Sequence, residues 1–215
     1  MYIHGMEQEF YTPGSVAGSY RGQRRSQDLR EAALTLFAER GYRGTTVRDI
    51  AQELGIQGPS LYNHMHSKQE ILRDIMFSTI EQAFAAQRVA IAGVDDVAEQ
   101  LRRAAEEHAR LAIRYRREVL ITHREIPSLD KQDQALISSK MKEYVRGFRV
   151  IIERGCSLGR FSVESPRVAS FAILEMLNGL EKWFRETGLH SEGEVIRQYG
   201  DFALRIVGVR DGQGS

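Results

Sequence analysis

The stretch TTVRDIAQELGIQGPSLYNHMHSK, residues 45–68, decides the fold that the sequence predicts. Thr46 is suited to N-cap a short helix, and Asp49, three residues on, favours the exposed amides of the first turn. Gly55 supplies the positive backbone angle that a tight exit from this helix needs. A second short helix then begins around Pro59, because proline is tolerated in a first turn. The pattern therefore predicts a helix, a turn and a helix.

The spacing of Ala51, Gly55 and Leu61 lets the two helices cross at a steep angle that pushes the second one outward. That helix is predicted for residues 60–65. Several side chains of this part of the chain have hydrogen-bonding groups: Gln57, Ser60, Tyr62, Asn63 and His64. A helix of this size fits the major groove of DNA, where such groups read base edges or contact phosphates. The alternative that this spacing leaves open is an ordinary helical hairpin whose polar face meets water.

The residues on both sides of this unit resemble those of a known family. The resemblance rests on three segments: FAERGYRGTTV at 37–47, IAQELGI at 50–56 and SLYNHMHSKQEIL at 60–72. Residues 25–75 as a whole resemble the N-terminal DNA-binding domain of TetR-family transcriptional regulators.

The resemblance implies a set of DNA contacts: Thr46, Arg48, Gln57, Gly58, Ser60, Tyr62, Asn63, His64 and Lys68. Their chemistry agrees with this role. The fork of Arg48 matches the two acceptors of a guanine, and the amide of Asn63 matches adenine. Tyr62, His64 and Lys68 suit phosphates, which position a protein without carrying sequence information.

The chain has 215 residues, a formal net charge of +1 and one cysteine. With so small a charge, a nucleic-acid surface has to be a local patch, and basic residues indeed outnumber acidic ones between positions 21 and 68. The single Cys156 excludes an intramolecular disulfide and fits a cytoplasmic setting. Every apolar run is broken by charge before it reaches the length of a membrane span. We therefore expect a cytoplasmic protein without a membrane segment.

The fold class predicted is all-α, with an N-terminal three-helix helix-turn-helix domain followed by a larger helical domain for ligand binding and dimerisation. We expect residues 1–20 to be a flexible extension, 21–70 the DNA-binding domain and 71–215 the effector-binding and dimerisation domain. The apolar periodicity predicts these helices outside the helix-turn-helix: 26–40, 67–91, 95–125 as one helix or a broken pair, 130–155, 166–186 and 192–207. The arginines at 21–25 form either a basic arm that reaches DNA or a tail without a role.

The helix predicted for 166–186 is apolar nearly all round, so it has to be covered on both sides. A partner chain covers it most simply, which predicts a two-fold homodimer with a four-helix bundle made from the last two helices of each chain. The resemblance implies the same arrangement. A monomer with a well-filled core is the alternative. In a dimer, two reading helices about 34 Å apart meet successive major grooves of a palindromic operator.

A pocket between the helices of the second domain is the first candidate for a ligand site. Its expected apolar wall contains these residues: Met141, Phe148, Phe171, Met176 and Trp183. The segments THREIPSLD at 122–130 and EVIRQYGDFALRIV at 194–207 resemble the TetR-family branch that controls lipid and sterol catabolism and senses acyl-CoA thioesters. Arg124, Arg146 and Arg185 are then candidates for the CoA phosphates. Core packing and solvent-exposed charge are the alternative roles for these side chains.

No enzyme is predicted, because the sequence lacks a two-histidine helical metal motif, a nucleophile elbow, a P-loop and a dinucleotide fingerprint. Neither a metal nor a cofactor is expected. The sequence predicts a dimeric repressor that binds operator DNA and is released by a small apolar effector, such as an acyl-CoA thioester. Three alternatives stay open. The protein is a sensor of another hydrophobic compound such as a drug, or an activator of transcription, or a helical protein-interaction module.

Overall fold

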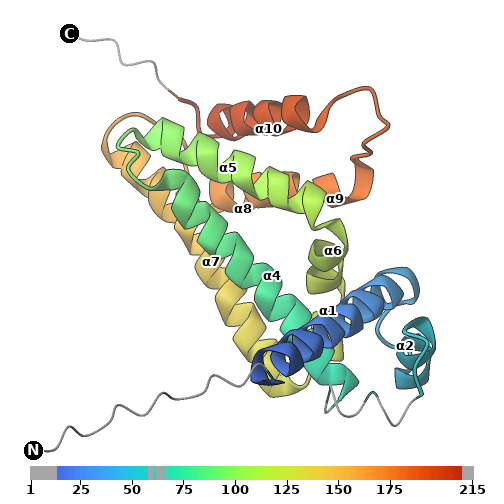
Figure 1. The fold of residues 1–215 in the computed structure, drawn as a ribbon. Coiled ribbons are helices and arrows are strands. Elements are labelled where there is room, and N and C mark those ends of the chain that lie inside the picture. Colours follow the sequence, from blue (N-terminus) through green and yellow to red (C-terminus); the bar gives the residue numbers. More distant parts are fainter. Residues whose placement is uncertain (1–13, 58–60, 62–64, 66, 210–215) are drawn as a thin grey trace, which may run out of the picture.

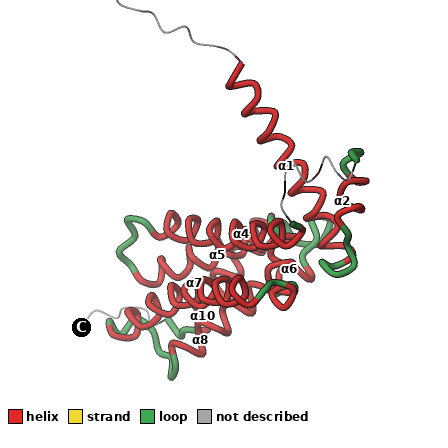
Figure 2. The backbone as a smooth tube through the Cα atoms, turned by 90° about the horizontal axis from the view of Figure 1, so that it is seen from below, coloured by secondary structure: helices red, strands yellow, loops and turns green. Residues whose placement is uncertain are grey.

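The computed structural model describes residues 14–57, 61, 65 and 67–209, and it places them in helices and connecting loops without a strand (Figure 2). The elements are α1 (Gly14–Arg40), α2 (Val47–Glu53), α4 (Lys68–Ile91), α5 (Val97–Arg114), α6 (Arg116–Arg124), η1 (Ile126–Ser128), α7 (Lys131–Ser157), α8 (Pro166–Asn178), α9 (Leu180–Trp183) and α10 (Glu192–Ile206). The all-α prediction is confirmed over this part of the chain.

Side-chain caps set the starts of the later helices close to where the sequence predicts them. The hydroxyl of Ser67 accepts the N–H of Glu70 at 3.1 Å, and the carboxylate of Asp130 accepts the N–H of Asp133 at 2.9 Å. At α10, Ser191 and Glu194 form a reciprocal capping box. Each cap satisfies an amide that has no partner within its own helix.

Two helix boundaries differ from the prediction, and the structure decides between the two forms predicted for 95–125. Helix α1 begins at Gly14 instead of Ser26 and so overlaps the predicted extension; no proline interrupts the chain between Gly14 and Arg40. The segment 95–125 is a broken pair that separates at Tyr115. The predicted helix 166–186 was too long, because the helix is interrupted at Gly179 and the backbone becomes extended at Phe184.

The helices form two groups joined by α4 and α7, which run side by side across the molecule (Figure 1). Helices α1 and α2 lie at one end of this pair, with α6 against α1. Helix α5 packs on the other half of α4, α8 packs on α7 and α5, and α10 packs on α5 and α8. Helix α4 therefore begins in the group of α1 and α2 and ends inside the second group.

The apolar residues divide into two cores. The first, called the head core, is formed by α1, α2 and the first half of α4 with Leu61, Met65 and three residues farther along the chain, Ile121, Leu129 and Ile137. The second, called the C-terminal core, joins α5, α7, α8 and α10. Phe84 of α4 packs against both cores. The same helix thus takes part in the packing of both groups.

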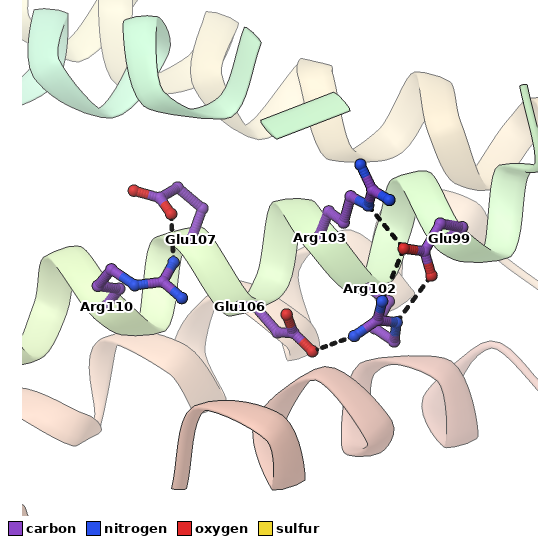
Figure 3. Close-up of polar contacts among 6 residues, drawn as sticks. All are labelled: Glu99, Arg102, Arg103, Glu106, Glu107 and Arg110. Carbon is purple, nitrogen blue, oxygen red and sulfur yellow. Dashed lines mark hydrogen bonds and ion pairs between the residues drawn. The ribbon is translucent and has the colours of Figure 1, made fainter. Parts of the chain in front are cut away.

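Helix α5 also has a charged face, shown in Figure 3. The guanidinium of Arg102 donates to Glu99 at 2.6 and 2.8 Å and to Glu106 at 2.5 Å. These hydrogen bonds hold the pKa of Glu99 below its usual value. Helix α10 crosses this face at Gly200, where a Cβ would lie 2.9 Å from the Cγ of Glu106. A glycine is therefore needed for α10 to pack closely on α5.

Candidate DNA-reading head and effector site

The N-terminus of α2 is held by a reciprocal cap, as the sequence predicts. The hydroxyl of Thr46 accepts the N–H of Asp49 at 3.1 Å, and the carboxylate of Asp49 accepts the N–H of Thr46 at 2.7 Å. The hydrogen bonds from Thr46 lower the pKa of Asp49. At the other end, Gly55 has a φ of 65°, which allows the tight exit. Ile50 is fully buried in the head core, so α2 is fixed to α1 at a defined angle.

Three of the predicted DNA contacts lie exposed on this unit: Thr46, Arg48 and Gln57. The predicted residues Gly58, Ser60, Tyr62, Asn63 and His64 lie outside the described residues. Leu61, the expected apolar anchor of the second helix, is buried in the head core. The assignment of DNA contacts therefore stays a prediction, with Arg48 and Gln57 accessible for it.

Lys68 is placed differently from what a phosphate contact requires. Its ammonium donates to the backbone carbonyls of Tyr42 at 2.7 Å and Thr45 at 2.6 Å, and it lies 4.0 Å from the centre of the Tyr42 ring. Burial lowers the pKa of Lys68. The nearby carboxylates, of which Glu125 has the larger effect, partly offset this shift. In this conformation Lys68 braces the turn before α2.

The structure does not bring the eight predicted ligand-site residues together. Phe148 is buried in the C-terminal core and Met176 packs on it, whereas Met141 packs on the head core. The remaining five are exposed: Arg124, Arg146, Phe171, Trp183 and Arg185. The guanidinium of Arg124 reaches the backbone carbonyl of Phe37 at 2.5 Å, which places this side chain at the contact with α1.

A polar set in the C-terminal core was missed by the sequence analysis. His108 of α5 has its Nδ1 2.9 Å from the hydroxyl of Tyr144 on α7 and its Nε2 2.9 Å from the Oδ1 of Asn178 on α8. We call these three residues the His108 set. Around it lie aromatic rings: Phe148 contacts His108 edge to face, and Phe84 contacts Tyr144 in the same way.

Loss of hydration makes the His108 set electrostatically unusual. It lowers the pKa of His108 to about 4, so the imidazole is neutral at physiological pH, and it raises the pKa of Tyr144. The signal in the sequence was the presence of His108, Tyr144 and Asn178 on otherwise apolar helix faces. Tyrosine and asparagine on such faces also occur in plain cores, so only their contact across three helices identifies the set.

Four buried side-chain atoms of the described residues have no hydrogen-bond partner, and two of them belong to uncharged side chains. These two are the Nε2 of Gln87 on α4 and the Oγ1 of Thr122 on α6. Gln87 lies beside Gly147, one helical turn from Tyr144. Unpaired buried donors and acceptors cost free energy, so groups of this kind are candidates for contacts to a ligand.

The surface between α4 and α5 has a separate open groove with a volume of about 450 Å³. Its lining includes Ala86 and Val89 of α4 and Leu111 and Tyr115 of α5. None of the predicted ligand-site residues lines it. Among the described residues there is no group of three or more potential metal ligands, and no helix is long and apolar enough to cross a membrane.

A capped α2 with a glycine turn and the buried Leu61 beyond it, joined through the long α4 to a larger all-α domain, is the arrangement expected of helix-turn-helix transcriptional regulators. Comparison with family models places the chain within that class. Residues 29–75 match the family described as bacterial regulatory proteins, tetR family, and residues 94–207 match the tetracyclin repressor-like C-terminal domain. The chain belongs to the TetR family, and the predicted resemblance is confirmed.

Two of the relatives indicate a branch of the family. The chain is 31% identical over 191 residues to the HTH-type transcriptional repressor KstR2 of Rhodococcus jostii strain RHA1, covering 84% of this chain and 89% of KstR2. The solved structure of the ketosteroid transcriptional regulator KstR2 of Mycobacterium tuberculosis superposes with a TM-score of 0.80 at 25% identity, over 87% of this chain and 96% of that one. The chain is thus similar to KstR2 repressors, and these relatives are transcriptional regulators.

A third comparison adds to the description of the fold. The structure of AibR in complex with isovaleryl coenzyme A and operator DNA superposes with a TM-score of 0.75, over 85% of this chain and 97% of AibR. At 24% identity this likeness shows a shared fold. The same helical architecture is therefore known with both DNA and an acyl-CoA bound.

Proposed function

We propose that this repressor binds a palindromic operator as a dimer and is released by an apolar effector, an acyl-CoA thioester of lipid or steroid breakdown. The observation that carries the effector part is the His108 set, a hydrogen-bonded polar group in an otherwise apolar core. KstR2 as a relative and the fold shared with AibR support the chemical class of the effector. The C-terminal segments 122–130 and 194–207 support it by their resemblance to the acyl-CoA-sensing branch.

The His108 set matches a ligand that is mostly apolar and has one or two carbonyl groups. The hydroxyl of Tyr144 and the amide of Asn178 are hydrogen-bond donors suited to a ketone or thioester oxygen. Phe84 and Phe148 supply apolar surface beside them. A site that pairs a few polar groups with an apolar wall is the usual form of a small-molecule pocket.

Release is proposed to act through α4. This helix packs in the head core through Ile71, Leu72 and Ile75 and contacts the C-terminal core through Phe84. An effector that prefers a tilted α4 weakens operator binding by the ratio of its affinities for the two states. A hundredfold preference corresponds to about 2.7 kcal/mol.

The dimer is proposed to form through α8, α9 and α10. Exposed apolar side chains lie on all three helices, among them Phe171 at 47%, Trp183 at 49% and Phe202 at 36% exposure. The rings of Trp183, Tyr199 and Phe202 form a row with centroid separations of 6.2 and 5.7 Å. Phe202→Glu is expected to shift the protein toward monomers in analytical ultracentrifugation, because it places a charge in an apolar contact. Leu158→Glu, at an exposed apolar residue after α7, is the matched control and should leave the mass unchanged.

The function is tested by titrating the protein on DNA from upstream of its own coding region, with steroid and long-chain acyl-CoA thioesters and the matching free acids. Release by a thioester but not by its acid supports the proposal. Tyr144→Phe should weaken the response about tenfold, because one hydrogen bond to the ligand is lost. Tyr115→Phe is its control, since Tyr115 is an exposed tyrosine at the C-terminal cap of α5, outside the His108 set and the proposed dimer contact. Operator binding that no thioester changes would contradict the effector class.

A further inference from the structure

Helix α6 is attached along α1 by an arginine near each of its ends. The guanidinium of Arg117 pairs with the carboxylate of Glu31 and donates to the hydroxyl of Thr35 at 2.8 Å. At the other end, Arg124 donates to the backbone carbonyl of Phe37 at 2.5 Å. That carbonyl belongs to the last turns of α1, where cations are favoured by the helix dipole. Helix α6 of the C-terminal domain therefore lies against the helix on which the DNA-reading unit is built.

Glu125, directly after α6, extends this contact to the turn between α1 and α2. Its side chain is 10% exposed, and its carboxylate accepts three hydrogen bonds. The donors are the N–H of Tyr42 at 3.2 Å, the Nε of Arg124 at 3.0 Å and the hydroxyl of Ser128 at 2.9 Å. A buried carboxylate with several donors is a strongly held group, because the bonds are charge-assisted.

The same turn is also held by Lys68, the first residue of α4. Its two carbonyl acceptors belong to Tyr42 and Thr45, and Thr45 in turn donates to the carbonyl of Gly41 at 2.9 Å. Gly41 has a φ of 78°, the left-handed conformation that glycine adopts readily. The next residue, Thr46, caps α2. The turn at 41–45 thus connects the charged side chains of Glu125 and Lys68 to the start of α2.

We propose that Glu125 and Lys68 are positioning residues for operator binding, which together fix the turn at 41–45 and so the angle of α2 relative to α6 and α4. We call this arrangement the turn clasp. It links the C-terminal domain to α2 directly through α6, in addition to the path along α4. The proposal depends on operator binding, which the family establishes, and not on the identity of the effector.

The clasp assigns Lys68 a task different from a phosphate contact, and the two roles give different salt dependence. A lysine that neutralises a phosphate adds about one unit per protomer to the slope of log affinity against log salt. A lysine that only holds the turn contributes to operator affinity but does not change the slope of log affinity against log salt. The salt dependence of a Lys68 variant therefore distinguishes a phosphate contact from support of the turn.

The experiment measures operator affinity of the full-length protein without effector, for Glu125→Ala, Glu125→Gln and Lys68→Met. We expect Glu125→Ala and Lys68→Met to weaken binding about tenfold, as the loss of charge-assisted hydrogen bonds implies, and Glu125→Gln to lose less because its amide oxygen still accepts from Tyr42. The salt slope of Lys68→Met should equal that of the unaltered protein.

A matched pair elsewhere in the chain provides the controls. Glu81 of α4 pairs with Lys140 of α7, whose ammonium also lies near an aromatic ring, that of Phe77 at 5.6 Å. Glu81→Ala and Lys140→Met break this pair without touching the turn at 41–45, and they should change operator affinity less than twofold. Thermal unfolding is recorded for every variant, and Glu125→Gln decides the outcome if Glu125→Ala does not fold.

Operator affinity within twofold of the unaltered protein for folded Glu125→Gln and Lys68→Met would overturn the clasp. A salt slope reduced by about one unit per protomer in Lys68→Met would assign Lys68 to a phosphate and overturn its bracing role. If no thioester releases the unaltered protein, the proposed effector fails while the clasp is still decided by these affinities. The two proposals therefore fail separately.

Discussion

The two cores of this molecule differ in the polar groups that they contain. In the head core the fully buried Phe37, Ile50 and Leu72 join α1, α2 and α4, and the buried polar residues Thr45 and Glu125 lie in the turn after α1 and directly after α6, where both are hydrogen-bonded. The C-terminal core surrounds the His108 set with its hydrogen bonds across three helices. An apolar core favours one fixed arrangement, whereas interior polar groups reduce stability unless they are fully paired. The comparison indicates that the paired polar groups of the head hold the turn before α2, whereas the His108 set joins α5, α7 and α8 across the C-terminal domain.

The largest expected effect compares one buried phenylalanine from each core. Phe37→Ala should reduce the free energy of unfolding by about 3–5 kcal/mol, because it leaves a cavity in the head core, and should abolish operator binding. Phe148→Ala, equally buried in the C-terminal core, should cost similar stability but retain operator binding at low temperature. Urea unfolding and DNA titration measure both. Equal loss of operator binding in the two folded variants would show that the cores do not act separately.

Arg48 tests whether the exposed face of α2 reads bases. Arg48→Ala is expected to lower affinity for the operator by about 1–3 kcal/mol at one base position and to relax the preference there, since one bidentate contact is lost. Binding to a set of operators with single base changes measures this. Arg88→Ala, on the last turn of α4, is the control. A loss that is the same for all sequences would contradict base reading by Arg48.

The pH dependence of stability should differ between the cores because His108 belongs to one of them. Its pKa is about 4 in the folded chain and 6.5 as a free side chain, so the unfolded chain binds the proton first as the pH falls. Stability contributed by the neutral imidazole is complete above pH 6.5 and lost as the pH falls toward 4. Because His108 is partly exposed, the free energy of unfolding should fall by only about 1–2 kcal/mol at pH 5. His108→Leu should remove this component from the unfolding curve; an unchanged curve would show that other groups cause it.

The smallest expected effect compares two capping boxes. Thr46→Ala and Ser191→Ala each remove a hydroxyl that accepts an amide at a helix start. Both should cost about 1 kcal/mol of stability. Only Thr46→Ala should also weaken operator binding, because α2 belongs to the reading unit and α10 does not. Similar operator affinity in the two variants would make the cap of α2 a purely structural feature.

Local patterns in the sequence were sufficient for the all-α class and for most helix starts. Thr46, Ser67 and Asp130 act as caps because each lies next to the amides that it pairs with, so short-range spacing contains the whole signal. Gly55 likewise ends α2 through its own backbone freedom. The helix 166–186 was predicted too long because a single glycine does not by itself show where packing will make the chain leave the helix.

The sites depended on contacts between residues far apart in the chain. The sequence alone determined the helices, the helix-turn-helix and the family that it resembles, because these rest on neighbouring residues and their spacing. Only the tertiary structure showed that Phe171 and Trp183 face outward, that His108 meets Tyr144 and Asn178, and that Arg124 and Glu125 hold α1 and the turn before α2. Helical periodicity gives the face on which a side chain lies, but the partner of that face is decided by how the helices pack.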